Sequence, residues 1–600
     1  MRGVGGGLTC GETSGSRARE PKKGSRVAEM TPVIVVGGGP TGLTAALELA
    51  YRAVPSIVLA AGRQRSDGSR AIALHRTALA VWERLGCAAP MLAQGVAWRA
   101  RHTFYRDREL YTQLMPTATS GALPTFLNLQ QYRTEDHLIR RVASEPLIHL
   151  RWQHQVVGVA QDESGVLLEV MAPSGPVRLR GSYVLACDGA RSSMRKLLRL
   201  AFSGTTYPDR FLIADIRARL PLAPEPRFFF DHPTNPGSTI LIHPQPDGIW
   251  RIDWQLGAAV DIIAERAPEA VHHRIRSLIG EIPYELVWLS DYRFHQRQLD
   301  RLRHDRVFFL GDAAHLVAPF GARGLNSAIH DVENLGWKLA AVLRDEAPQT
   351  LLDTYQAERW PAQRHDQAVT NATMRFMAPR SPLQRLRRTA ILRLSTICPT
   401  ACRWVNSGTM SQPFTYRASP ILVPDNTPRR GWRGAPAPGA KAPDVRCQLI
   451  DRPAAAGPTW LRHLLGAGFV ALYFTLGWAT ARAMADHAAP DYHPVTLTVL
   501  PVFAQMPPGP ADRPAVWDDT GELHRAFAAQ PGTLFLIRPD GYIAARRRRT
   551  CPAELTSLVR LASGHSPRRH PADPVVTASL GSTPVGCAPP VAVQPHHWRH

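Results

Sequence analysis

The chain has few cysteines, and their spacing excludes the common metal and thiol-redox sites. Its 600 residues include eight cysteines, at positions 10, 87, 187, 398, 402, 447, 551 and 587. No two of them form the CxxC pair of a thioredoxin-type redox site. Cys398 and Cys402 are four residues apart, but no second pair or nearby histidine cluster completes a zinc site. We therefore expect no bound metal, and the scattered thiols favour a reduced, cytoplasmic setting.

Acidic residues are also scarce. The chain has 49 Asp and Glu against 71 Lys and Arg, a formal charge of +22. Such an excess is typical of proteins that bind nucleic acid or anionic membranes. Here the arginines are spread along the chain and no nucleic-acid motif accompanies them. We favour solvated arginines that attract anionic ligands, and we expect no nucleic-acid partner.

The sequence predicts no secretory leader and no clear membrane span. Residues 1–29 are rich in Gly, Ser, Arg and Lys and lack the apolar core of a signal peptide, so we expect a disordered extension or a misassigned start. Residues 464–481 carry no charge and nearly reach the length of a span. Three glycines, Tyr473 and Thr475 within this run favour a buried strand and turn instead.

A glycine-rich turn follows the first apolar strand. Residues 33–36 are a β-branched run, and the next six residues contain GxGxxG at Gly37, Gly39 and Gly42, with Pro40 and Thr41 inside the turn. An alanine- and leucine-rich helix is expected over 43–52. Gly37 permits the tight turn, Gly39 lets the backbone approach a pyrophosphate, and Gly42 lets the helix pack on the strand. Free N–H groups at the helix start attract phosphates. The pattern predicts a dinucleotide site.

One part of this fingerprint is missing. An Asp or Glu is expected at the tip of the second strand, ~20 residues on, to bind a ribose hydroxyl. The strand over 56–60 ends instead in Ala60 and Ala61. Nucleotide binding is then weaker, or Gln64 or a backbone group replaces the acid, or the ligand has been lost. If the ribose simply lacks its partner, Ala60→Glu should tighten binding.

A second strand-loop-helix unit lies far downstream. The strand over 306–310 ends in Gly311 and Asp312, a glycine-rich loop spans 319–326, and a long amphipathic helix begins near Leu325. Two such distant units suggest one extended ligand held at both ends. A third motif begins at Asp188, after a strand over 183–186. By itself it is equally an ordinary Asp-Gly turn with a helix N-cap.

Together the ordered motifs resemble those of the FAD-dependent aromatic hydroxylases (group A flavin monooxygenases), and most of all the hydroxyphenylpropionate and phenol hydroxylases. The resemblance covers 31–361 and continues more weakly to 546. It implies that Asp312, with Gly311, holds the ribityl or ribose part of FAD and that the three glycines hold the pyrophosphate. It places Arg70 near the phosphates, Gln131 along the flavin, and Asp188 near FAD and NAD(P)H. The loop with Pro319, Gly324, Leu325 and Asn326 would direct helix N–H groups at the flavin.

The resemblance also implies the reaction. NADPH or NADH reduces FAD, dioxygen adds at flavin C4a, and the hydroperoxide hydroxylates a phenolic or similar aromatic substrate. An antiparallel sheet would form one wall of the substrate pocket. His243, Trp250, Arg251 and Trp254 are candidates for that wall, or are ordinary sheet neighbours, and we name no catalytic acid or base. The helix motifs over 334–339 and 355–361 are expected to serve packing.

The expected architecture is α/β, with a Rossmann-like FAD-binding domain interleaved with an antiparallel-sheet substrate domain. The expected segments are a disordered extension (1–29), the FAD-binding domain (30–205 and 301–424), the substrate sheet (206–300), a linker (425–445), a thioredoxin-like α/β domain (446–563) and a disordered tail (564–600). The C-terminal domain would brace the enzyme or form a homodimer surface. A degenerate flavin-binding protein, or a flavin-dependent halogenase or epoxidase, is the alternative. The WxWxIP motif of halogenases is absent.

Overall fold

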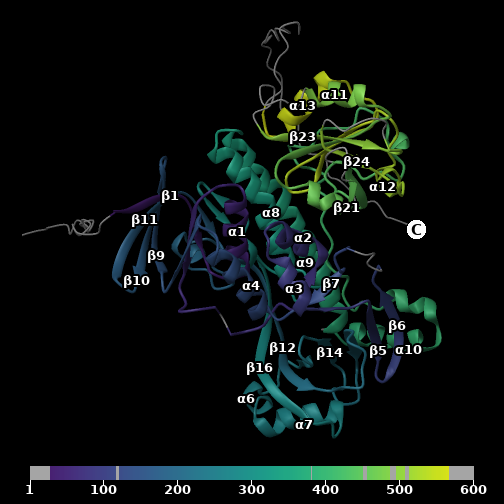
Figure 1. Cartoon of the computed structure of the whole chain (residues 1–600). Coiled ribbons are helices and arrows are strands. Elements are labelled where there is room, and N and C mark those ends of the chain that lie inside the picture. Colours follow the sequence, from purple (N-terminus) through teal and green to yellow (C-terminus); the bar gives the residue numbers. More distant parts are fainter. Residues whose placement is uncertain are drawn as a thin grey trace, which may run out of the picture.

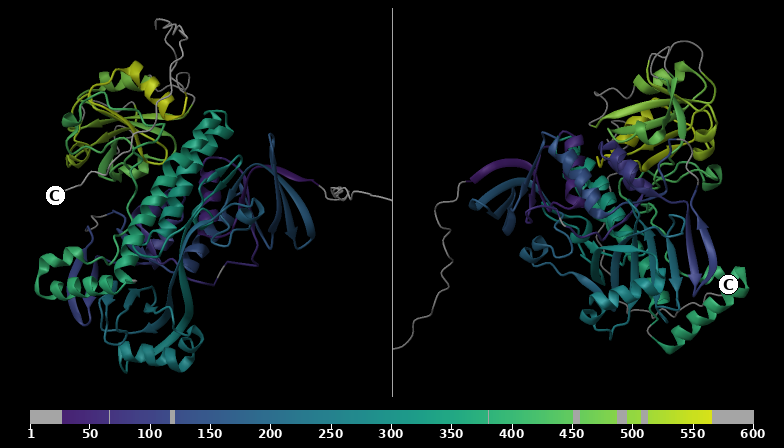
Figure 2. Two further views of the ribbon diagram at one scale, coloured as in Figure 1. Left: turned by 180° about the vertical axis from the view of Figure 1, so that it is seen from behind. Right: turned by 60° about the horizontal axis from the view of Figure 1, so that its bottom comes forward.

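Three large sheets and two long helices make up the chain (Figure 1). The computed structural model describes residues 27–65, 67–116, 121–379, 381–450, 456–486, 495–506 and 513–565. In Figure 1 the first sheet lies at the left, the second at the bottom and the third at the top. The helices α8 (Gly324–Leu343) and α9 (Asp353–Met377) run between the third sheet and the other two, as both views of Figure 2 also show.

The first sheet carries the glycine-rich turns. Its order is β17-β18-β11-β1-β2-β8, and β10 extends it by pairing with β11 and β9. The elements of this region are β1 (Val27–Val36), α1 (Pro40–Tyr51), β2 (Ser56–Ala60), α2 (Arg76–Arg84), α3 (Ala88–Gln94), α4 (Gln131–Ala143), β8 (Ile148–Trp152), β9 (Gln155–Asp162), β10 (Gly165–Ala172), β11 (Gly175–Ala186), α5 (Ser193–Leu197), β17 (Arg303–His304) and β18 (Val307–Phe309), with a small sheet of β3 (Ala73–His75), β7 (Phe126–Asn128) and β4 (Val96–Ala97).

The apolar residues of β1 explain its central place. The run over 33–36 is buried and lies between two parallel neighbours, β2 and β11, as a strand covered on both faces must be. The strand begins at Val27, so it includes the last three residues of the expected extension. Helix α1 begins at Pro40, three residues before the expected start, because proline suits the first helical turn.

The second sheet is mostly antiparallel, with the order β19-β16-β12-β15-β14-β13-β5-β6. Its strands are β5 (Ala100–Tyr105), β6 (Arg108–Leu114), β12 (Ser203–Ala218), β13 (Arg227–Phe230), β14 (Thr239–Pro244), β15 (Ile249–Leu256), β16 (Tyr284–Gln298) and β19 (His315–Leu316), and the helices α6 (Ile262–Glu265) and α7 (Pro268–Ile279) accompany it. One face packs on α7 through Val271 and Ile275. The other face turns toward the loop before α8, because Phe211 and Phe294 contact Phe320 of that loop.

The third sheet is mixed, with the order β21-β20-β24-β23-β22-β25-β26. Its elements are β20 (Arg446–Ile450), β21 (Ala456–Trp460), β22 (Phe469–Phe474), α11 (Trp478–Asp486), β23 (Leu497–Phe503), β24 (Ala515–Trp517), α12 (Glu522–Phe527), β25 (Leu534–Ile537), β26 (Ile543–Arg547) and α13 (Pro552–Ala562). The uncharged run over 464–481 thus contains a buried strand and the start of a helix. The thioredoxin-like assignment of this α/β domain stays a prediction.

Buried side chains from 425–445 and from β26 complete the C-terminal domain. Trp432, within the expected linker, is buried in the core of the third sheet. Arg546 and Arg547, at the end of β26, are also buried and pair with Asp425 and Glu554. Pairing with carboxylates offsets the cost of burying these cations. The expected tail lies outside the described residues from 566 on.

A buried ionic network fixes the third sheet to α8 and α9. Glu358 of α9 accepts hydrogen bonds from Lys338 (2.7 Å) and Asn334 (2.6 Å) of α8. Arg538, which follows β25, donates to the same carboxylate at 2.9 Å and also pairs with Asp540. The side chains of all five residues are buried. The helix motifs over 334–339 and 355–361 therefore serve packing, as expected.

Candidate functional site

The backbone path requires glycine at two positions of the first turn, Gly37 and Gly42. Gly37 has φ +123°, and a Cβ on it would lie 2.3 Å from the Cys187 carbonyl oxygen. A Cβ on Gly42 would lie 1.9 Å from the Gly37 oxygen. Gly39 is different, because nothing lies within 4 Å of where its Cβ would be. The start of α1 is therefore open to an incoming ligand, next to Pro40 and Thr41, and its unpaired N–H groups suit a phosphate.

Gly311 and Asp312 lie beside this turn. At Gly311 (φ +57°) the chain leaves β18, and a Cβ there would approach Thr41 Oγ1 to 2.8 Å and the Ala328 methyl to 3.0 Å. The second unit thus packs directly on the first. Asp312 is exposed, although Gly311 and Ala313 on either side are buried. The turn presents one carboxylate at the place where the two units meet.

The charge of Asp312 depends on its surroundings. Burial by the surrounding protein raises the pKa of this carboxyl, while His315, Arg70 and Arg195 lower it. The side chain is exposed and faces these three cationic groups, which favour the ionised carboxylate.

Arg70 and Gln131 are brought together on the same side. Gln131 Oε1 accepts hydrogen bonds from the N–H groups of Ala71 (3.2 Å) and Arg70 (3.4 Å), so α4 fixes the loop that carries Arg70. The Arg70 guanidinium lies over the Tyr292 ring, 5.5 Å from its centroid. Tyr292 belongs to β16, so Arg70 lies where the first and second sheets meet.

Asp188 has two roles divided between its oxygens. Oδ2 accepts hydrogen bonds from Met194 N–H (3.0 Å) and Ser193 Oγ (3.1 Å), which caps the start of α5. Oδ1 is buried and has no hydrogen-bond partner among the described residues. The N-cap alternative is therefore correct for one oxygen, and the other remains available to a ligand.

Arg195 joins the Asp188 motif to the Asp312 turn. Its guanidinium donates to the carbonyl oxygens of Ala313 (2.7 Å), Gly189 (3.2 Å) and Asp312 (3.3 Å). Arg195 was not among the predicted site residues, because nothing in the sequence indicated that it bridges two distant turns.

The loop before α8 ends at the same place. Gly324 is the first residue of α8, Leu325 follows, and Pro319 is exposed at the start of the loop. The Asn326 side chain is fully used within the protein: it accepts from His75 N–H (2.9 Å) and donates to the carbonyl oxygens of Ala73 (3.0 Å) and Ala322 (2.6 Å). Asn326 therefore fixes the helix start, and only its main chain can reach a ligand.

Asp331 organises this region from behind and was missed by sequence reasoning. Its carboxylate accepts from Gly311 N–H (3.0 Å), His315 Nε2 (2.8 Å) and Arg359 Nε (2.7 Å). Burial opposes ionisation, yet Arg359 and His315 hold its pKa well below the usual range. Nothing in the sequence around Asp331 set it apart, because His330, Glu333 and Asn334 lie beside it in α8.

Trp152 occupies the space beside Ala60, where the ribose-binding acid was expected. The two residues are paired on neighbouring strands. A Cβ on Gly38 would lie 2.8 Å from the Ala60 methyl and 3.5 Å from the Trp152 ring. Ala60 is only 3% exposed. The small residue at position 60 therefore leaves room for an indole next to the first glycine turn.

The second sheet presents an aromatic inner face to this region. Trp250 and Trp254 lie on the α7 face, whereas His243 and Arg251 alternate with the α7-facing residues and lie on the inner face. The inner face contains a cluster shared with the loop before α8 and with α9 and α10 (Pro382–Ile397): Tyr105, Tyr207, Phe211, Phe228, Phe230, Phe294, Phe320, Met374, Met377, Leu392 and Val405. Burial, with Arg251 and Arg101 adding to it, lowers the pKa of His243 to about 3. This histidine is neutral near pH 7.

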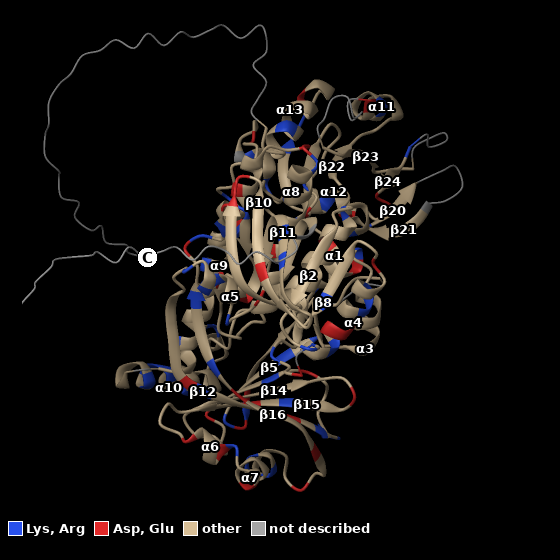
Figure 3. Cartoon of the chain, turned by 90° about the vertical axis from the view of Figure 1, so that its left-hand side faces the viewer, with Lys and Arg blue, Asp and Glu red and all other residues tan. Residues whose placement is uncertain are grey.

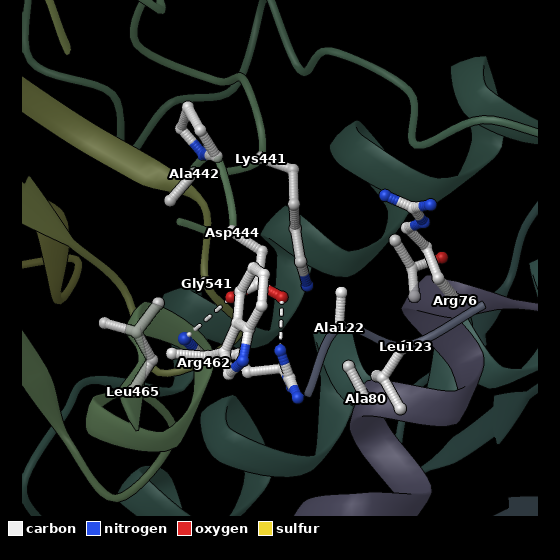
Figure 4. A pocket seen from close by; sticks show the side chains of 13 residues that line it. Arg76, Ala80, Ala122, Leu123, Lys441, Ala442, Asp444, Arg462, Leu465 and Gly541 are labelled. Atoms are coloured by element: carbon white, nitrogen blue, oxygen red, sulfur yellow. Dashed lines mark hydrogen bonds and ion pairs between the residues drawn. The ribbon is translucent and has the colours of Figure 1, made fainter. Parts of the chain in front are cut away.

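A separate pocket of about 100 Å³ lies between α2 and the C-terminal domain (Figure 4). Lys441, Arg462 and Arg76 line it together with apolar side chains such as Leu123. Arg462 pairs with Glu83 of α2 (2.6 Å) as well as with Asp444 (2.7 Å), and Lys441 pairs with Glu333 of α8 (2.7 Å). The pairs with Glu83 and Glu333 join the C-terminal domain to the helices of the first sheet.

The residues at the meeting of the two units fit FAD. They include an open glycine turn for a pyrophosphate, an exposed carboxylate for a sugar or ribityl hydroxyl, an unpartnered Asp188 oxygen and a second helix start for the flavin ring. Within the described ranges no group of His, Cys, Asp and Glu is arranged to hold a metal ion. No helix of that part of the chain is long and apolar enough to cross a membrane.

Comparison with known proteins agrees with this geometry. A family model described as an FAD binding domain matches residues 30–372. A 3-(3-hydroxy-phenyl)propionate/3-hydroxycinnamic acid hydroxylase of Mycobacterium sp. (strain KMS) is 29% identical over 576 residues, covering 92% of this chain and 96% of its own. A para-nitrophenol 4-monooxygenase of Pseudomonas sp. (strain WBC-3) is 30% identical over 370 residues, covering 60% of this chain and 91% of its own.

The fold has solved counterparts as well. The flavin-dependent monooxygenase PieE, solved in complex with FAD and substrate, superposes with a TM-score of 0.75 at 24% identity and covers 90% of this chain and 99% of its own. The family match extends over more than half of the chain, and the relatives are named as monooxygenases and hydroxylases. The chain therefore belongs to the FAD binding domain family and is an FAD-dependent, NAD(P)H-using monooxygenase.

Proposed function

We propose that this monooxygenase hydroxylates a phenolic or related aromatic compound held between the inner face of the second sheet and the loop before α8. The aromatic cluster on that face carries the proposal. Phe320 belongs to the loop that leads to the flavin-facing helix start, and it contacts Phe294 (5.6 Å) and Phe211 (6.0 Å) of the sheet. A ring bound among these side chains would lie beside the start of α8.

The inner face also favours a substrate that carries a negative charge. Arg101 is buried and forms no ion pair with a described carboxylate; it donates to Ser407 Oγ (3.0 Å) and Gln113 Oε1 (3.0 Å), and its Nε has no partner. Burial lowers the pKa of this guanidinium, although it stays a cation. A buried cation without a counter-ion is stabilised by an anionic ligand.

Each group at the site then has a task. FAD, when bound, supplies the transfer of one oxygen atom from dioxygen, with NAD(P)H as reductant. Asp312, the glycine turn and Arg70 would hold it. The N–H groups at the start of α8 would stabilise negative charge on the flavin ring without reorganising. The aromatic inner face would orient the substrate ring and exclude water. The hydride donor stays either NADH or NADPH.

A panel of phenols tests the proposal. FAD-loaded protein is mixed with NADPH or NADH and each phenol, and NAD(P)H consumption is followed together with hydroxylated product. We expect consumption to accelerate with at least one phenol and product to appear in proportion. Phenols with a carboxylate should be preferred, and Arg101→Gln should remove that preference while neutral phenols are still hydroxylated.

A protein that binds FAD but responds to no phenol would support the degenerate alternative, which the missing acid at position 60 motivates. The cytoplasmic setting expected from the sequence remains part of the proposal, and the six described cysteines, all free thiols, support it.

A further inference from the structure

Helix α10 carries an outward-facing apolar stripe. It lies beside β5 and β6 in Figure 1, and Figure 3 shows it at the edge of the molecule. Leu383 (76% exposed), Leu386 (67%), Leu394 (42%) and Ile397 (78%) all lie on its solvent side. Their spacing of three, eight and three residues, with exposed Ala390 between them, places them on one face of a helix. The helix thus directs its apolar side away from the protein.

The opposite face of α10 is the one that packs. Arg388, Leu392 and Ser395 are buried there, and Arg388 donates to the carbonyl oxygens of Met377 (2.7 Å) and Gly237 (3.1 Å). Leu392 belongs to the aromatic cluster of the proposed substrate wall. The orientation of the helix is therefore fixed by contacts, and the exposed stripe is not a consequence of a loosely placed element.

Arginines flank the stripe on both sides. Arg387 lies one turn after Leu383 and Arg393 lies two turns after Leu386, so they border opposite edges of the apolar face. Neither forms an ion pair with a described carboxylate. Residues 367–424 contain eight arginines and no Asp or Glu. Beyond the helix, Trp404 is 51% exposed and the Arg403 guanidinium lies 5.1 Å from its ring.

We propose that α10 and the turn after it (Pro399–Trp404) bind the surface of an anionic lipid bilayer, with the helix lying in the interface. A basic helix with leucine and isoleucine on one face, and a tryptophan beside it, can bury its apolar side chains among acyl chains while its arginines meet phosphate groups. The helix does not span the bilayer. The inference does not depend on the proposed substrate.

Charge distinguishes this occupant from a second copy of the chain. Two α10 helices packed through their stripes would bring Arg387 and Arg393 of both copies together, with no carboxylate on either helix to separate them. Anionic headgroups are complementary to these arginines and to the +22 charge of the whole chain.

Vesicle flotation tests the proposal. FAD-loaded protein is floated with vesicles of phosphatidylcholine alone and of phosphatidylcholine with one third phosphatidylglycerol. We expect binding only to the vesicles that contain phosphatidylglycerol, and weaker binding at high salt. The double variant Leu386→Gln, Ile397→Gln should lower the partition coefficient by roughly tenfold or more, since both side chains would no longer enter the acyl region. Ile263→Gln, an 80% exposed apolar residue on α6, is the matched control and should bind as the parent does.

The arginines are tested separately. Arg387→Gln with Arg393→Gln should weaken binding to the anionic vesicles, while Arg140→Gln on α4 should not. Flavin absorbance reports that every variant is folded. The proposal is overturned if the parent does not float with anionic vesicles, or if the Leu386 and Ile397 variant floats as well as the parent. Light scattering that shows a dimer which this variant dissociates, without vesicle binding, would assign the stripe to a second copy instead.

Discussion

At the scale of single residues, Asp312 owes its position to its neighbours. The turn that carries it is held by Asp331 through the Gly311 N–H and by Arg195 through the carbonyl oxygens of Asp312 and Ala313, so the exposed carboxylate is fixed in place before a ligand arrives. Preorganised groups bind more tightly than mobile ones because less ordering is needed.

Replacing Asp312 should therefore remove flavin. A hydrogen bond to a charged group contributes about 1.5–3 kcal/mol, so Asp312→Ala should weaken FAD binding by roughly ten- to a hundredfold. Quenching of FAD fluorescence on titration with apoprotein measures the affinity. Asp300→Ala, an exposed acid near the end of β16, serves as control and should keep the parental value. Equal affinities in the two variants would refute the role of Asp312.

The surroundings of Ala60 change the effect that we expect from Ala60→Glu. A glutamate there would lie against the Trp152 ring in a nearly buried place, where an unpaired carboxylate costs about 1–3 kcal/mol. Ala60→Glu alone should lower the melting temperature and should not tighten FAD binding. With Trp152→Ala the space opens, and the double variant should bind FAD more tightly than Trp152→Ala does. Thermal unfolding and FAD titration of the three variants test this prediction. If Ala60→Glu alone bound FAD more tightly and kept the parental melting temperature, the Trp152 ring would not prevent a glutamate from fitting at position 60.

At the scale of elements, the second sheet divides polar and apolar residues between its faces. Asp253 lies on the inner face next to Arg251, whose guanidinium is already paired in bidentate fashion with Asp215 at 2.8 and 2.9 Å. Burial raises the pKa of Asp253 to about 7, with Arg251 lowering it and Asp215 raising it further. Its Oδ1 has no partner among the described residues.

A pH dependence follows. The unfolded chain releases this proton near pH 4, whereas the folded chain keeps it until about pH 7. Between these values the folded state binds more protons, so stability falls as pH rises and stays low above pH 7. Asp253→Asn cannot ionise, so its free energy of unfolding should exceed that of the parent only above pH 4. The difference should grow up to pH 7 and then stay constant. We expect about 1–3 kcal/mol, because the Asp253 side chain is only half-buried. Urea unfolding at pH 4, 5, 6 and 8 measures it. A stability difference between Asp253→Asn and the parent that does not change with pH would contradict the raised pKa of Asp253. Glu281→Gln, at an exposed position, is the control, and its stability difference from the parent should not change with pH.

The sequence predicted the strands and glycine turns better than the contacts that these elements make with one another. The antiparallel sheet over 206–300 was predicted, yet the sequence alone does not say which of its faces is covered by α7. The glycine turns were predicted because only glycine tolerates their geometry. Asp331, Arg195 and Trp152 were not, since their roles depend on contacts between segments far apart in the chain. Asn326 was placed in the site, but its side chain serves the protein's own backbone.

At the scale of the whole molecule, buried ion pairs join the C-terminal domain to the flavin-binding part. Glu358 is the common acceptor for Lys338 and Arg538, and desolvation lowers the pKa of Lys338 to about 8 although Glu358 opposes it. Trp337 of α8 adds an edge-on contact with Phe469 of β22, with ring centroids 5.5 Å apart. The same helix α8 begins at the proposed flavin site, so we propose that the C-terminal domain braces an element that holds the cofactor.

Removing one partner of this network should therefore affect both domains. Arg538→Met leaves Glu358 and Asp540 buried without the guanidinium that they share, which costs about 3–5 kcal/mol. Arg525→Met is the control, because Arg525 lies in the same domain and is not part of this network. We expect the first variant to lower the melting temperature clearly, to expose residues 425–445 to limited proteolysis, and to weaken FAD binding through the loosened α8. The second should match the parent in all three measurements. If Arg538→Met were cleaved faster at 425–445 but kept the parental FAD affinity, the network would join the domains without supporting the cofactor. If α8 links the two, the variant should lose both its resistance to proteolysis at 425–445 and its FAD affinity.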